Sequence, residues 1–74
     1  MSATYLSADQ NWADASTTYW FEMDGAEYGI VESGSDSSPV NNNGFPIDYN
    51  DHLAALVVAE CIVTDEIRAK ASGL

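Results

Sequence analysis

The stretch TTYWFEMDGAEYGIVE, residues 17–32, decides the fold of this chain. Its two halves, residues 17–23 and 26–32, are rich in aromatic and β-branched side chains, which favour strands. Between them lies Asp24-Gly25, a dipeptide typical of two-residue turns because both of its positions adopt positive φ. The stretch therefore predicts an antiparallel hairpin with strands 17–23 and 26–32.

A two-residue turn also sets the register, so that Met23 faces Ala26 and Tyr19 faces Ile30. Side chains alternate between the two faces of a strand. The face that we expect in the core is wholly apolar and carries Tyr19, Phe21, Met23, Ala26, Tyr28 and Ile30. The opposite face is mixed and carries Thr18, Trp20, Glu22, Glu27, Gly29 and Val31.

The residues before the hairpin contain two local patterns. Thr4-Tyr5-Leu6 predicts a third short strand near residues 3–6. Ser7-Ala8-Asp9-Gln10 then resembles a helix capping box and predicts one or two helical turns through Trp12 and Ala15.

The residues after the hairpin change to Ser, Gly, Asn, Asp and Pro from Ser33 to about Ile47. These residue types are typical of turns and irregular segments. We expect a long flexible loop over residues 33–47, and loops of this length tend to be functional or mobile.

The last segment has the charge order of a helix over about 50–71. Asp48 and Asp51 lie at its start, and Arg68 and Lys70 lie near its end. One apolar face is predicted to pack on the hairpin, and it comprises Leu53, Leu56, Val57, Val63, Ile67 and Ala71. The β-branched pairs in residues 55–64 leave a strand there as an alternative.

Val58 and Ile62 fall on the opposite side of that helix. A helix that is apolar on two sides needs two covers, so either the N-terminal segment or a second copy of the chain should contact them. Glu60 lies inside the apolar stripe and requires a hydrogen-bond partner or access to water. Val58, Ile62 and Glu60 are therefore the candidate residues of a homodimer interface.

Together these elements predict an α+β fold in one domain, residues 1–74. A small antiparallel sheet packs on one C-terminal helix. The length leaves room for a single small core. Hydrophobic residues make up 46% of the chain, which is too many for a disordered segment.

The charge inventory is lopsided, with twelve Asp and Glu against two basic residues and a formal net charge of −10. Such a surface repels phosphate backbones and anionic lipid, and it attracts basic protein surfaces. We therefore expect no direct binding to nucleic acid and no binding to membranes.

The location expected from the sequence is the cytoplasm. Cys61 is the single cysteine and cannot form an internal disulfide. The first residues have no basic region followed by an apolar stretch, and the longest apolar run, residues 53–63, is about half the length that spans a bilayer.

No motif predicts catalysis, a metal or a cofactor, and we expect a protein that is not an enzyme. His52, the single histidine, lies more than two helical turns from Cys61, too far to share a proton on one helix. Asn41, Asn43 and Gly44 match part of a calcium loop, but its first and last ligands would fall on residues that are not acidic.

The acidic end of the hairpin is the candidate binding site. The predicted register puts Glu22 opposite Glu27, and such like charges destabilise a hairpin unless a partner compensates. Trp20 lies over Gly29 on the same face, where an arginine could pair with the acids and stack on the ring. The full set of predicted partner-binding residues is Trp20, Glu22, Asp24, Glu27, Glu32, Asp36, Asp9 and Asp14. Alternatively, the N-terminal segment covers Trp20 and the glutamates keep a sheet edge soluble.

In size, charge and sheet-plus-helix plan, the chain resembles the small acidic inhibitors that phages encode against host defences, including anti-CRISPR proteins and DNA mimics. The resemblance implies a protein in the host cytoplasm that inhibits a nucleic-acid-binding complex by occupying its basic surface. Carboxylates would take the places of phosphates. Two alternatives remain, a halophilic domain whose acidity serves solubility and a small dimeric interaction or immunity-type protein.

Overall fold

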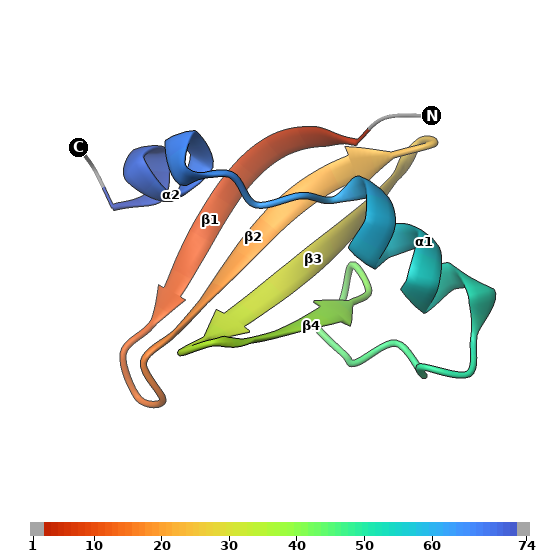
Figure 1. The fold of residues 1–74 in the computed structure, drawn as a ribbon, viewed down its shortest axis with the longest axis horizontal. Helices are drawn as coiled ribbons and strands as arrows, with labels where there is room; N and C mark the ends of the chain where they lie inside the picture. The colour runs from red at the N-terminus through yellow and green to blue at the C-terminus, as the bar shows by residue number, and fades with distance from the viewer. Residues whose placement is uncertain (1–2, 73–74) are drawn as a thin grey trace.

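A four-stranded antiparallel sheet is the framework of the computed structural model, which describes residues 3–72 (Figure 1). Each strand pairs with the next one along the chain, in the order β1-β2-β3-β4. The strands are β1 (Thr4–Asn11), β2 (Ser16–Met23), β3 (Ala26–Ser33) and β4 (Asp36–Val40). Two helices follow, α1 (His52–Glu60) and α2 (Asp65–Ala71). The fold is α+β, with more strands and shorter helices than the sequence predicts.

The predicted hairpin is confirmed as β2 and β3. Met23 pairs with Ala26, and Glu22 pairs with Glu27, as the two-residue turn requires. Asp24 has φ 58° and Gly25 has φ 81°, so both turn positions adopt the left-handed backbone that this dipeptide favours.

The N-terminal segment forms one long strand, so the predicted helical turns over residues 7–15 are wrong. β1 runs from Thr4 to Asn11 and pairs with β2 along its inner side, so a ladder of backbone hydrogen bonds replaces the single turn that a capping box would order. A bulge between Tyr5 and Ser7 shifts the register. Because of this extra residue, Tyr5 and Ala8 both contact the core.

Part of the predicted loop over residues 33–47 is also a strand. β4 joins the sheet through a tight turn in which Gly34 has φ 60° and Ser33 pairs with Asp36. Pro39 lies in this outer strand, where a missing N–H is tolerated. The polar composition of β4 hid it, because an edge strand does not need a run of apolar residues.

The predicted single helix over 50–71 is interrupted, and the alternative strand over 55–64 is wrong. α1 ends at Glu60, and Thr64 caps the start of α2 by accepting a hydrogen bond from the Ile67 N–H at 3.2 Å. An unbroken helix of that length would extend ~33 Å, whereas a strand of eight residues spans only ~26 Å. The break keeps both helices on the sheet (Figure 1).

The core lies between the helices and one face of the sheet. Phe21 and Tyr5 meet edge to face, with ring centroids 5.7 Å apart. Most of the predicted apolar face is buried, but Ala26 is exposed beside the turn and Tyr28 is only half-buried. The buried cluster comprises Tyr19, Phe21, Met23, Ile30, Ile47, Ala54, Val57 and Cys61.

Gly29 permits the close packing of the face opposite the helices. A Cβ at this position would lie 2.8 Å from Val40 Cγ2, 3.0 Å from Trp20 Cζ3 and 3.1 Å from Thr18 Cγ2. Glycine is therefore required here by the approach of three neighbouring side chains.

Replacing Gly29 with alanine should lower the free energy of unfolding by about 1–3 kcal/mol, the usual cost of overpacking. Urea denaturation measures this change. The double variant G29A/V40A should be more stable than the sum of the two single effects predicts, because V40A removes the nearest clashing methyl. A G29A protein as stable as the parent would contradict this packing.

Candidate functional site

One face of the sheet carries no helix. Both helices and the segment that joins them lie on the other side (Figure 1). We call the uncovered side the open face. Strand register assigns to it Thr4, Ser7, Asp9, Asn11, Ser16, Thr18, Trp20, Glu22, Glu27, Gly29, Val31, Ser33, Asp36, Ser38 and Val40.

The open face carries charge of a single sign. Asp9, Glu22, Glu27 and Asp36 are all exposed and come from four different strands. None of the side chains assigned to this face is basic. The charged side chains of this face therefore contribute only negative charge.

The two basic side chains of the protein lie on α2 and are paired within the chain. Arg68 donates two hydrogen bonds to Glu32, at 2.9 and 3.1 Å, and a third to Asp65 at 3.0 Å. The bonds to Glu32 raise the pKa of the Arg68 guanidinium. Lys70 lies 3.8 Å from Glu66. The structure thus keeps both positive charges away from the open face.

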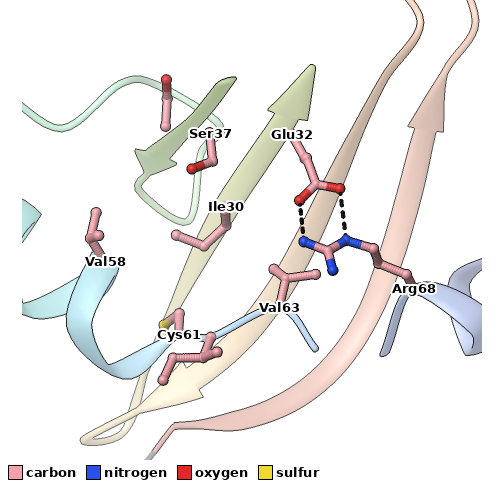
Figure 2. Close-up of a pocket in the computed structure, with 9 residues that line it drawn as sticks. Ile30, Glu32, Ser37, Val58, Cys61, Val63 and Arg68 are labelled. Atoms are coloured by element: carbon pink, nitrogen blue, oxygen red, sulfur yellow. Dashed lines mark hydrogen bonds and ion pairs between the residues drawn. The ribbon is translucent and has the colours of Figure 1, made fainter. Parts of the chain in front are cut away.

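Glu32 is the one predicted binding residue that the register places with the core instead of on the open face. It pairs with Ser37 and lies opposite Thr17, on the helix side of the sheet. Its carboxylate holds Arg68 and so joins α2 to β3 (Figure 2). This contact spans 36 positions of sequence, which explains why a local pattern did not reveal it.

The remaining predicted acids spread along the face and do not form one cluster. The β2–β3 turn lies at one end of the sheet, and the other two strand connections lie at the opposite end (Figure 1). Glu22, Asp24 and Glu27 therefore lie at one end, and Asp14 and Asp36 lie at the other. Asp9 pairs with Thr18, four residues along β2 from Glu22, or ~13 Å away.

Trp20 is a fixed apolar centre in this acidic face. Its indole Nε1 donates a hydrogen bond to Asp9 Oδ2 at 3.1 Å, and the side chain is half-buried. β1 therefore covers Trp20 in part, as the alternative interpretation of the sequence required, while the acids around the ring stay exposed.

The three dimer candidates lie on the helix side, beside an open cleft. Val58 is 51% exposed and Ile62 is 62% exposed, whereas Glu60 is half-buried at the end of α1. Val58 and Ile62 line a cleft of about 220 Å³ between strands β3 and β4 and the helices (Figure 2). β1 does not cover them because it joins the far edge of the sheet. Leu56, predicted to face the core, is 42% exposed.

Sequence reasoning missed Trp12, whose side chain is 85% exposed in the connection between β1 and β2. The predicted helical turns had placed this residue in a helix. The turn-forming residues Asn11 and Asp14 on either side of it are the local signal of a loop.

His52 and Cys61 lie at opposite ends of α1, so they form no catalytic pair. His52 is exposed at the first residue of the helix, and Cys61 is buried directly after the last. Burial, together with the nearby charge of Glu60, raises the pKa of the Cys61 thiol to about 11.

Residues 3–72 contain no group of three or more His, Cys, Asp or Glu side chains placed to hold a metal ion. Within the same residues, no helix has the length and apolar character needed to cross a membrane. Comparison of the chain with family models, curated proteins and solved structures finds no match.

The Cys61 thiol should react slowly with thiol reagents while the protein is folded, because burial both shields it and raises its pKa. At pH 8 the labelling rate of native protein should be well below that of protein unfolded in urea. The native rate should continue to rise above pH 9.0, the ordinary pKa of this thiol, toward pH 11. Equal rates for native and unfolded protein at pH 8 would refute this assignment.

Proposed function

We propose that this chain is a small acidic binding protein that inhibits a nucleic-acid-binding host complex by occupying its basic surface, as anti-CRISPR and DNA-mimic inhibitors do. The observation that carries the proposal is the open face, on which four strands present exposed carboxylates without one basic side chain. Carboxylates there take the places of phosphates on the target.

The rigid sheet and its charges of one sign favour electrostatic recognition of a basic partner. A sheet holds its charges on a rigid surface, so little conformational entropy is lost when the partner binds. A field of one sign steers a basic partner toward the face and raises the association rate. The cost of placing Glu22 opposite Glu27, a few tenths of a kcal/mol, is offset when a cation comes between them.

Neutralising the acids at the β2–β3 turn should weaken binding more than neutralising the same number of acids outside the open face and its loops. The variant E22Q/D24N/E27Q removes three charges from one end of the sheet, and asparagine keeps the left-handed backbone that Asp24 adopts. The matched control D48N/E60Q/E66Q removes three charges outside the open face. The expected loss in association rate is about tenfold for the first variant at low salt.

The measurement is affinity capture from host lysate at about 0.05 M and 0.5 M salt, followed by binding kinetics with the captured protein. That protein should bind nucleic acid, release it when this chain is added and dissociate at high salt. Affinity that is independent of salt, or equal effects of the two variants, would contradict the proposal.

A second candidate is the homodimer, which the exposure of Val58 and Ile62 favours. These residues lie on the helix side, so a dimer formed there leaves the open face free. Two chains of charge −10 repel each other, and salt screens this repulsion.

Dimerisation should therefore strengthen as salt rises, opposite in sign to binding on the open face. Sedimentation at micromolar concentration measures it, and V58D/I62D should abolish it. A monomer at every salt concentration would exclude the dimer.

A further inference from the structure

The most exposed of the large apolar side chains identified in residues 3–72 is Trp12, in the connection between β1 and β2. Tyr49, at 72% exposed, and Phe45, at 65%, follow it. Tryptophan is the side chain most enriched at the energetic centres of protein interfaces. Its position at the end of the sheet makes it accessible to a partner without rearrangement of the fold.

The loop that carries Trp12 is held by its own side chains. Asn11 Oδ1 accepts a hydrogen bond from the Ala13 N–H at 3.1 Å. Asp14 Oδ1 accepts from the Ser16 N–H at 3.2 Å and from its hydroxyl at 2.6 Å. The loop is therefore ordered before a ligand arrives, which lowers the entropic cost of binding.

A hollow of about 160 Å³ lies beside the indole. Drug-sized ligands occupy pockets of about 300–1,000 Å³, so this hollow suits one side chain of a partner. Its lining mixes the indole with amides and hydroxyls, from Gln10, Asn11, Trp12, Ala15, Ser16 and Thr17. Such a lining suits a group that is flat and also donates hydrogen bonds.

The charges around the loop favour a positively charged partner side chain in this hollow. Asp14 lies two residues from Trp12 and is exposed. Only its Oδ1 is used by the loop, so Oδ2 is available to a cation. The two basic residues of the chain are on α2 and paired there. A positive group therefore meets no competing charge of its own sign in this loop.

We propose that Trp12 anchors an arginine of the basic partner, with the guanidinium stacked on the indole and paired with Asp14. Arginine fits better than lysine because its guanidinium is planar, weakly hydrated and able to stack on an aromatic ring. This inference rests on the proposed function and adds to it the type of side chain that the partner must present.

The probe is a tetra-arginine peptide, titrated into the full ¹⁵N-labelled chain at low salt, with tetra-lysine as the comparison. The indole signals of Trp12 and Trp20 are followed separately. The Trp12 signal should move to saturation, and tetra-arginine should bind about two- to fivefold more tightly than tetra-lysine.

W12A should abolish this preference, and D14N should reduce binding while keeping the Oδ1 contacts of the loop. The matched control is Y49A, which removes another exposed aromatic ring and should leave the preference unchanged. The spectra of all three variants report whether the sheet remains folded.

The outcomes separate the two proposals. If tetra-arginine binds the parent protein and W12A equally, the Trp12 inference is wrong and the proposed function stands. If neither basic peptide binds the parent protein at low salt, the electrostatic basis of the proposed function fails too. A blue shift of tryptophan fluorescence on phosphatidylcholine vesicles that W12A abolishes, without a response to the peptides, would assign the loop to a lipid surface instead.

Discussion

The turn at Asp24-Gly25 is the constraint on which the rest of this structure depends. Positive φ at both residues closes β2 onto β3 in one register, which places Tyr19, Phe21 and Ile30 on a single face. That face carries the apolar side chains that pack with the helices. A slip of one residue would exchange the two faces and bury Glu22 and its neighbours. The fold and its acidic surface are therefore two results of the same local geometry.

The register also explains how so acidic a chain folds with only two basic residues. Acids on the open face reach water, where their repulsion is screened. Glu32 faces the other way and would be poorly solvated beside the core, and it receives Arg68 with two hydrogen bonds. Arg68 is therefore used where an anion is partly covered, Lys70 lies beside the exposed Glu66 on the same helix, and the open face is left without a basic side chain. The two faces of the sheet thus differ in charge because they differ in burial. Exposed acids on the open face are solvated by water, whereas the partly covered Glu32 is paired with Arg68.

The parts of the fold that the sequence predicts are those in which local preference and tertiary packing agree. The hairpin is such a case, because its turn residues and its alternating pattern specify the same register. β1 is the opposite case, since Ser7 and Asp9 favour a helix start locally and pairing with β2 overrides them. The break between α1 and α2 was visible in the sequence only in part. Thr64, followed by acidic residues, is itself a cap signal, but the continuous apolar stretch around it resembled a single helix.

The candidate site likewise contains residues whose positions the sequence predicts and contacts that it does not. The places of Glu22 and Glu27 follow from the register alone, whereas the contact between Asp9 and Trp20 depends on a strand that was not predicted at its full length. That contact fixes the ring of Trp20 in the middle of the face, so it contributes a rigid surface to the proposed interface. Trp12 has no such contact and stands beside a hollow at the end of the sheet. Long-range attraction arises from acids distributed over the whole face and depends little on the detail of the partner. Selectivity requires a site of defined shape, and Trp12, the most exposed of the large apolar side chains identified in residues 3–72, lies beside a hollow that has one.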